Sequence, residues 1–545
     1  MRTWKINIQP TKDAVLCDYF AENTTAAKCM YNVANFYIRN TMTGIRKSPE
    51  ERTACETEVL HYVFTGIQKA NLHARENYEK KLKKYQDMHT EKGDKLAADL
   101  KCKVFPYPTK EKWFLSYGAL DAIFKYTDHP TYRRMNSHVN QNAIKKAVKG
   151  WKSYFKAVRD YAVHPEKYKA RPRIPGYKHA AKMTAAYTSQ TAVFSCQDGH
   201  AYLKFVNHKQ PVRIGKESLY ADMTYAKTEV KPQYGGYTIL VTFKEDLVLP
   251  EVPKQPKRIL GIDVGVSNLA AVANNFGDTP FLIKGGALKS MNQKFNKQRA
   301  KLLSAVTKGS DSTHSKKETK QLQALSRKRD AFLRDFFYKT AWYLVRYAKK
   351  HQVDVIVIGH NEDQKQNIRI GKQNNQNFVS IPFCQFIKIL RNTAAKAGIP
   401  VADREESYTS KASLLDLDAI PTYRKGNTQA YTFSGKRVHR GLYKTNSGCV
   451  INADINGAGN ILRKEYPYAF DGQDMSYLYK TTKVVSYTDI YAGAKSVCKE
   501  KYNQKSHEPG LGSRVNHRYR QDTRLIYRKL WGRSTFVWTG KKKTA

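Results

Sequence analysis

The stretch GIDVGVSNLAAVANN, residues 261–275, decides how this sequence is interpreted. Ile262, Val264 and Val266 are typical of a buried β-strand, yet Asp263 stands among them. Burying a lone carboxylate costs several kcal/mol unless a cation or a hydrogen-bond donor meets it. The pattern therefore predicts a strand whose acidic side chain faces a partner.

The composition indicates several domains and a polyanionic partner. A chain of 545 residues is too long for one ordinary core, and three or four domains are expected. Its 95 Lys and Arg stand against 47 Asp and Glu, a formal net charge of +48. Because this charge is spread along the chain rather than gathered in one amphipathic segment, nucleic acid is favoured over a membrane surface.

No sequence signal points to a membrane or to secretion. No window of about 18 uncharged apolar residues is present, and MRTWKINIQPTKDAVL at the N-terminus lacks the apolar core of a signal peptide. The eight cysteines are scattered without a CxxC pair, which supports neither a disulfide framework nor a zinc ribbon. We expect a reduced, cytoplasmic protein that binds no zinc.

The first half of the chain changes from helical to strand-like patterning. Helical periodicity runs from about residue 24 to 161, and residues 140–158 place one apolar face on a helix, made of Ala143, Ala147, Trp151, Tyr154 and Phe155. Any single lysine of that helix is typical of a solvated residue, and only the sum of such faces favours a nucleic-acid surface. The basic connector KARPRIPGYKH ends the helices.

Strand patterns follow the connector. AVFSCQDGHAYLKFV predicts a hairpin with Asp198-Gly199 at its turn, and YGGYTILVTF predicts another strand. A small β-domain therefore spans about residues 180–255, and the strand-like first dozen residues are candidates to complete it. From about residue 258 to 464 strands and helices alternate, the pattern of an α/β domain.

Three acidic positions of the α/β region form a candidate site. Asp263 lies in the first strand, Glu406 (beside Glu405) ends the strand VADREES, and Asp454 begins the helix NADINGAGNIL. Each pair of carboxylates at about 4 Å would cost roughly 4 kcal/mol at an effective dielectric of about 20. Divalent cations relieve such repulsion, and Mg²⁺ prefers oxygen ligands. Two such ions can stabilise both oxygens that exchange at a phosphodiester.

Each acid taken alone has a simpler explanation. Asp454 is also the helix N-terminal residue that the helix dipole favours, and Glu405 and Glu406 are also typical solvent-facing charges. Asp263 is alternatively a turn residue. Their order along the chain, strand then strand end then helix, is what favours a common site.

At these residues the sequence resembles the OrfB/TnpB family of insertion-sequence proteins, relatives of the type V CRISPR effectors. The resemblance is carried by GIDVGVSNLAAV, VDVIVIGHNEDQKQN, NNQNFVSIPFCQFIKIL, EESYTSKASLLD, FSGKRVHRGLY and INADINGAGNIL, with RPRIPGYK upstream. Together these segments cover most of residues 140–465 in the family's order.

The resemblance implies a multidomain α+β protein. A β-barrel wedge domain is expected over residues 1–15 and 165–255, with a helical recognition lobe inserted at 16–164. An RNase H-like (RuvC) α/β nuclease domain is expected over 256–465, with a lid at 408–450 in place of the zinc ribbon. A basic tail is expected from 466 to 545.

The resemblance also implies that the protein is an RNA-guided DNA endonuclease, encoded by a transposable element in a prokaryotic cell. Guide RNA and target DNA are the implied partners, with no membrane partner, and the chain is a monomer or a homodimer. Two Mg²⁺ ions, with Mn²⁺ as an alternative, are implied at Asp263, Glu406 and Asp454. A type V CRISPR effector, a catalytically silent RNA-guided DNA-binding protein and an RNA-free resolvase or transposase are the rival interpretations.

Two departures from the family bear on these expectations. The commoner pattern ends the fourth strand with a glutamate, where this chain has Gly359. A subset supplies it from just before the YTS segment, which favours Glu406, with Glu405 second and Glu362 third. The zinc-ribbon cysteines are also missing.

Basic residues at two places are candidate nucleic-acid ligands. The connector contributes Arg171, Arg173 and Lys178, and the lid contributes Lys436, Arg437 and Arg440. The three lid residues are equally well explained as solvated charges. Asn460, beyond Asp454, is either a support for the site or a helix surface residue.

Overall fold

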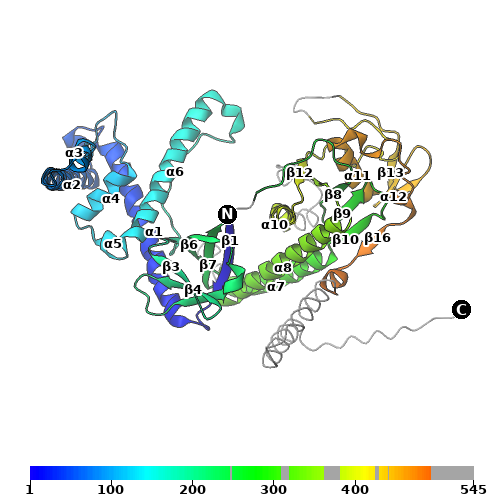
Figure 1. Cartoon of the computed structure of the whole chain (residues 1–545), viewed down its shortest axis with the longest axis horizontal. Helices are drawn as coiled ribbons and strands as arrows, with labels where there is room; N and C mark the ends of the chain where they lie inside the picture. Colours follow the sequence, from blue (N-terminus) through cyan, green and yellow to red (C-terminus); the bar gives the residue numbers. More distant parts are fainter. Residues whose placement is uncertain (246–247, 309–317, 361–380, 424–428, 440, 493–545) are drawn as a thin grey trace. The chain divides into compact units, whose positions relative to one another are not determined.

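The computed structural model in Figure 1 describes all residues except 246–247, 309–317, 361–380, 424–428, 440 and 493–545. Contacts divide the chain into two units. The first holds residues 1–249 and 290–333, and the second holds residues 250–289 and those from 334 onward. Helices α7 (Gly286–Thr307) and α8 (Lys320–Lys350) contribute residues to both units.

The sheets of the first unit join the start of the chain to a segment far along it. One sheet has the order β1-β7-β6-β2, and the other has the order β3-β4-β5. Their bounds are β1 Arg2–Ile8, β2 Ala185–Thr188, β3 Ala192–Gln197, β4 His200–Phe205, β5 Val212–Lys216, β6 Thr224–Gln233 and β7 Gly236–Lys244. Strand β1 pairs antiparallel with β7, so the helices between β1 and β2 are inserted into this sheet. The predicted hairpin turn is confirmed, with positive φ at Asp198 and Gly199.

The helices of the first unit pack around aromatic residues. They are α1 Ala14–Gly44, α2 Ala54–Gln86, α3 Glu91–Ala98, α4 Tyr117–Tyr126, α5 Pro130–Arg133 and α6 Ser137–Val163. Short 3₁₀ turns cover Pro49–Glu51, Pro165–Lys167 and Glu217–Leu219. Trp151 of α6 is fully buried, and its indole N–H donates to Asn35 Oδ1 of α1 at 2.8 Å. The predicted apolar face of α6 is confirmed, with Ala143 and Ala147 buried beside Trp151.

The basic connector is held against α1. The Asn35 amide donates to the Pro175 carbonyl at 3.1 Å, and the Arg39 guanidinium donates to the same oxygen. Two hydrogen bonds join the Asn32 side chain to the backbone of Lys178. These bonds fix an extended segment that has no helix or strand of its own.

A six-stranded sheet forms the centre of the second unit. Its order is β12-β11-β8-β9-β10-β16, with β9 antiparallel to β8 and β10 and the other neighbours parallel. The bounds are β8 Ile259–Asp263, β9 Asn268–Asn274, β10 Phe281–Lys284, β11 Val355–Gly359, β12 Val401–Arg404 and β16 Lys483–Val485. All residues of β9 and β11 are buried, as expected of central strands covered on both faces.

Helix α11 (Ala453–Glu465) lies directly on this sheet. A Cβ atom at Gly261 of β8 would stand 2.4 Å from the backbone oxygen of Ala458, so only glycine allows this approach. Further elements are α10 Phe383–Lys396, α12 Tyr477–Lys480, the 3₁₀ turn Pro467–Phe470, and a small sheet of β13 Lys436–His439, β14 Leu442–Lys444 and β15 Val450–Asn452. The short distance between α11 and β8 brings the start of the helix to the end of the strand.

The second unit continues beyond residue 465, where the sequence predicts a basic tail. Phe470, Leu478 and Ile490 are buried, and β16 pairs parallel with β10. The domain boundary therefore lies later than predicted, because the Lys- and Tyr-rich composition hides a strand with two apolar residues. Residues 493–545 lie outside the described part. No helix in the described part has the length and apolar character that a membrane crossing requires.

Candidate active site

Asp263 is the last residue of β8, not a residue in the middle of a longer strand as its surroundings predict. Val264 and Val266 are only half-buried, because the chain leaves the sheet there. The Asp263 carboxylate points toward α11, where a Cβ at Gly457 would come within 3.0 Å of its Oδ2 atom. The strand end and a glycine of the facing helix thus make room for this carboxylate.

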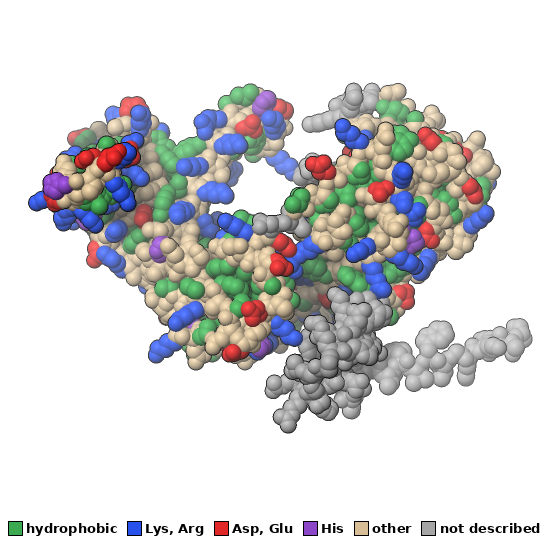
Figure 2. All heavy atoms as spheres, in the orientation of Figure 1, with side chains coloured by type: hydrophobic (Ala, Val, Ile, Leu, Met, Phe, Trp, Pro, Cys, Tyr) green, Lys and Arg blue, Asp and Glu red, His purple; other side chains and the backbone are tan. Residues whose placement is uncertain are grey.

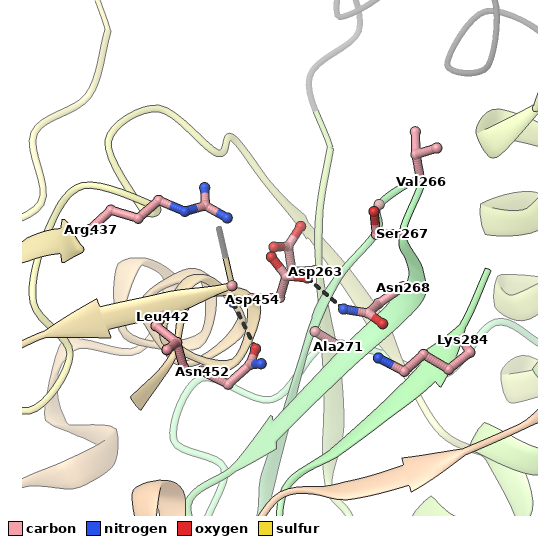
Figure 3. Close-up of a pocket in the computed structure, with 12 residues that line it drawn as sticks. Asp263, Val266, Ser267, Asn268, Ala271, Lys284, Arg437, Leu442, Asn452 and Asp454 are labelled. Atoms are coloured by element: carbon pink, nitrogen blue, oxygen red, sulfur yellow. Dashed lines mark hydrogen bonds between the residues drawn. The ribbon is translucent and has the colours of Figure 1, made fainter. Parts of the chain in front are cut away.

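Asp454 lies in the first turn of α11, opposite Asp263 (Figure 3). The Asn452 side chain caps the helix by accepting from the backbone N–H groups of Asp454 and Ile455, at 3.0 and 3.3 Å. The Asp454 carboxylate accepts a 2.6 Å hydrogen bond from the Asn268 side chain of β9. Two asparagines therefore fix the helix start and the direction of its carboxylate.

The two aspartates lie in a pocket of about 520 Å³. Lys284 of β10 and Arg437 of β13 also line it, and Figure 3 shows the Arg437 guanidinium pointing toward the two carboxylates. Both cations are exposed at the pocket's edge. The pocket thus combines an acidic floor with basic groups that can contact a phosphate.

The pKa of the Asp263 carboxyl is raised from 3.8 to about 7. Burial is the largest cause of this rise, the neighbouring Asp454 carboxylate contributes to it, and the Arg437 guanidinium opposes it. Without another cation, Asp263 is therefore partly protonated near neutral pH. The side chain that Asp263 faces in the structure is thus a second carboxylate, and the predicted cation would relieve the repulsion within this pair.

Glu406 lies on the same side of the sheet as Asp263. A Cβ at Gly359, the last residue of β11, would come within 2.7 Å of the Glu406 Oε1 atom. Residues Ile358 and Ile262 are paired in the parallel ladder of β11 and β8, so Gly359 is the neighbour of Asp263. The Glu406 carboxylate thus fills the space that a side chain at the end of β11 would take.

Glu405 points to a different partner. Its carboxylate accepts from the Lys464 ammonium at 2.6 Å and from the Ser407 backbone N–H at 2.7 Å. The Lys464 side chain is only 2% exposed, and it also donates to the Ser407 carbonyl. These contacts give Glu405 a structural function in holding the chain after β12.

Two buried asparagines of α11 connect the helix to the segment after Glu406. Asn460 donates to the carbonyls of Thr409 and Ala412, at 2.9 and 2.7 Å. Asn456 donates to Ala412 and accepts from the Leu414 N–H. Asn460 is therefore a buried support and not a surface residue. Asn456 and Asn268 are not among the residues that the sequence predicts for the site. Asn268 is a polar residue directly before the apolar run LAAVA.

Two carboxylates connect separate segments of the lid, residues 408–450, which stands where the family has its zinc ribbon. Asp416 accepts from the Ser413 hydroxyl at 2.6 Å and from the Asn446 N–H at 2.9 Å. Asp418 accepts from the Ser434 hydroxyl at 2.5 Å and from the Ser413 N–H at 2.7 Å. Three separate segments of the lid are thereby held together.

The remaining predicted residues are distributed over the chain. Arg171, Arg173 and Lys178 are exposed on the connector of the first unit, and Lys436 is exposed on β13. Arg440 and Glu362 lie outside the described residues. Among the described residues, no three His, Cys, Asp or Glu side chains are close enough to hold a metal ion. Asp263 and Asp454 line the same pocket. Glu406 remains the predicted third carboxylate of this site.

Two protein-family models match the chain. OrfB_IS605, described as a probable transposase, matches residues 228–365. The TNB domain described as Cas12f1-like matches residues 383–461. The first match holds Asp263 and the second holds both Glu406 and Asp454, in the order of the chain. Over these two ranges the chain is similar to the OrfB/TnpB family, as its motifs predict.

Solved structures related to this TnpB-like chain are distant. A Cas12f1–sgRNA–target DNA complex has 14% identity and a TM-score of 0.41, covering 84% of this chain and 98% of its own. A CRISPR-Cas12f ternary complex has 13% identity and a TM-score of 0.29, covering 85% and 99%. C2c1 from Alicyclobacillus acidoterrestris with single-guide RNA has 9% identity and a TM-score of 0.27, covering 80% and 69%. A search of curated proteins found no match.

Proposed function

We propose that the protein is an RNA-guided DNA endonuclease of a transposable element, with an RNase H-like (RuvC) nuclease domain. The observation that carries this proposal is the pair of carboxylates, Asp263 and Asp454, facing each other in an open pocket with basic edges. The matches to the OrfB_IS605 and Cas12f1-like TNB family models support the reaction class. Sequencing of RNA that co-purifies with the protein, together with cleavage of matching DNA, tests it.

The residues of the pocket fit Mg²⁺. Asp263 and Asp454 offer carboxylate oxygens, and a cation bound there would favour the charged form of Asp263, whose pKa is raised to about 7. The buried Oδ1 atom of Asn268 has no hydrogen-bond partner in the described part of the chain, and it lies beside Asp454. We propose Asp263, Glu406 and Asp454 as the ligands of two ions, with Mn²⁺ as an alternative.

When bound, such ions acidify an attacking water and neutralise charge on the leaving 3′ oxygen. The chain's own residues do the positioning. Asn268 keeps the Asp454 carboxylate turned into the pocket, and Arg437 and Lys284 can contact the phosphates of the strand that enters. Asn456 and Asn460 hold the segment after Glu406 against the same helix.

Helix α6 supplies a surface for the guide RNA and target DNA. Successive exposed basic residues of this helix are four or three positions apart, so they share one helical face. They are Lys145, Lys149, Lys152, Lys156 and Arg159. Figure 2 shows Lys and Arg side chains along this helix. Such a stripe matches the regular spacing of phosphates rather than one compact ligand. We propose that it contacts a nucleic-acid backbone.

Replacing Lys149, Lys152 and Lys156 together by Gln should weaken nucleic-acid binding and its salt dependence. Each lost contact to a duplex phosphate should flatten the slope of log K against log salt by about 0.9. Fluorescence anisotropy over a salt series measures both quantities.

The matched control replaces three exposed lysines on or between strands β4 and β5, Lys204, Lys209 and Lys216, by Gln. The total charge changes equally, so an equal loss in this control would show that α6 has no special function in binding.

The pKa of Asp263 predicts how Mg²⁺ stabilises the protein at different pH. Because the folded-state pKa of about 7 lies above the unfolded value of 3.8, the metal-free protein loses stability as pH rises between these values. Mg²⁺ binds the charged form, so it should raise Tm more at about pH 8 than at about pH 6. Thermal unfolding at both pH values, with Mg²⁺ or EDTA, measures this difference.

Asp263→Asn is the control for this prediction. It removes the titrating group and its repulsion with Asp454, so the metal-free variant should have a Tm about 2–6 °C above that of the wild type at about pH 8. An unchanged Mg²⁺ effect in this variant would exclude Asp263 as a ligand.

A further inference from the structure

A second cavity, of about 710 Å³, lies at the other end of strand β10 from the pocket that holds the carboxylates. Strand β10 reaches both places, since Phe281 at its start lines the second cavity and Lys284 at its end lines the first. Strand β16 and the C-terminal half of α8 complete the walls. The cavity lies wholly within the second unit and is separate from the candidate active site.

Aromatic rings form one wall of this cavity. Phe281 is 3% exposed, and its ring contacts Tyr347 edge-on with centroids 4.8 Å apart. Tyr343 also contacts Phe281 edge-on, with centroids 6.0 Å apart. Trp342 and Tyr343 are half-buried, so part of each ring stays accessible. The buried rings therefore hold a partly exposed aromatic surface in place.

Cationic side chains surround the aromatic wall. Arg346 and Lys350 are exposed one turn apart on α8, and Lys483 is exposed on β16. The Arg346 guanidinium lies 5.3 Å from the Trp342 ring centroid. Asp278 is the one carboxylate among the described lining residues.

That carboxylate already has partners. Asp278 Oδ2 accepts from the Tyr347 hydroxyl at 2.5 Å and lies 3.5 Å from His351 Nε2. The three cations therefore outnumber the acidic charge at the cavity, and its field attracts anions.

We propose that this cavity binds one or two unpaired nucleotides of a nucleic-acid strand. A base would stack on Trp342 or Tyr343, and the adjacent phosphates would contact Arg346, Lys350 and Lys483. Flat aromatic rings beside cations suit a base with its phosphate, whereas an acidic peptide offers charge without a ring to stack. The inference builds on the proposed nucleic-acid function but uses none of the carboxylates that we assign to cleavage.

Photo-crosslinking of the full chain in EDTA tests this site. The probes are short oligo-uridine carrying thiouridine and short oligo-thymidine carrying iododeoxyuridine, and peptide mass spectrometry locates the adducts. We expect adducts on Trp342 or Tyr343. The paired changes Arg346→Gln and Lys350→Gln should lower their yield about fivefold or more, because both phosphate contacts are lost. Lys349→Gln, an exposed neighbour outside the cavity, should leave the yield unchanged.

A second variant tests stacking directly. Trp342→Leu keeps an apolar side chain and should lower the adduct yield on Tyr343 roughly 5- to 100-fold if a base stacks there. Thermal unfolding of each variant shows whether it is folded. Adducts from one probe alone identify the strand as RNA or as DNA, and adducts from both show a site that accepts either sugar.

Three outcomes would overturn the proposal. The first is adducts that map only to other peptides. The second is an equal loss in Lys349→Gln, and the third is equal competition by polyglutamate, which would indicate attraction of any polyanion. The crosslinking is measured in EDTA, which prevents cleavage. A negative crosslinking result therefore does not contradict the proposed nuclease activity, and the site can be tested even if the protein does not cleave DNA.

Discussion

Asp263→Ala and Asp454→Ala should each lower Mg²⁺-dependent DNA cleavage by roughly 1,000-fold or more. Metal ions contribute several kcal/mol of charge stabilisation in the transition state, and each 1.4 kcal/mol corresponds to about tenfold in rate. Binding of guide RNA and target DNA should stay near the wild-type level, since these carboxylates contribute no cationic contact. Cleavage of guide-matched DNA and anisotropy in EDTA measure the two effects.

Asp403→Asn is the matched control for the two aspartate variants. Asp403 lies on β12 of the same sheet, its side chain is 45% exposed, and it pairs with Arg391 outside the pocket. This variant should cut at nearly the wild-type rate. A normal rate in Asp263→Ala or Asp454→Ala would contradict the two-metal assignment, and normal binding with no cleavage in the wild type would favour a silent RNA-guided DNA-binding protein.

Glu406→Gln should lower cleavage about 100-fold or more, whereas Glu405→Gln should leave most activity in place. The physical reason is that the Glu406 carboxylate lies beside Gly359, the sheet neighbour of Asp263, whereas Glu405 binds the buried Lys464. Glu405→Gln should instead lower the stability by about 1 kcal/mol, because the buried Lys464 ammonium would donate to a neutral amide oxygen in place of a carboxylate. Cleavage assays and thermal unfolding of both variants separate these functions.

A positional exchange sharpens this test. Gly359→Glu alone should be nearly inactive, because its Cβ would stand within 2.8 Å of Glu406 atoms. Combining it with Glu406→Gly removes the contacts with Glu406 and returns a carboxylate to the end of β11. The Cδ1 atom of Ile461, which would stand 2.5 Å from the same Cβ, must still move aside, so only part of the activity should recover. Gly359 is not among the described glycines with positive φ, so a side chain fits its backbone conformation. A folded but inactive double variant would show that a carboxylate attached at position 359 cannot replace the one attached at position 406.

The sequence predicts two aspartates that the structure brings into one pocket, and most of the elements that carry them. A single acid in an apolar strand and another at the start of a helix are local patterns, and the predicted helices and strands around them occur in the structure. The preference for Glu406 over Glu405 as a proposed ligand rests on the structure. It depends on where β12 ends and on which neighbour lies near Lys464, and neither follows from two adjacent glutamates.

The residues that hold the site in place could not be predicted from the sequence either. Asn268 reaches Asp454 across 186 positions, and only the register of β8 with β9 together with the position of α11 brings them together. The carboxylates that join the lid are typical surface residues when considered singly. Local patterns predict elements, whereas such contacts depend on how distant elements pack.

The last strand of the six-stranded sheet limits how far the protein can be shortened. Strand β16 covers the edge of β10, and it comes from the chain that follows the helix of Asp454. A fragment that stops at Glu465 would expose unpaired N–H and C=O groups along β10, and such open edges promote aggregation between copies. Compact versions of this protein and fusions to its C-terminal side should therefore keep the chain through at least residue 490, whose side chain is buried.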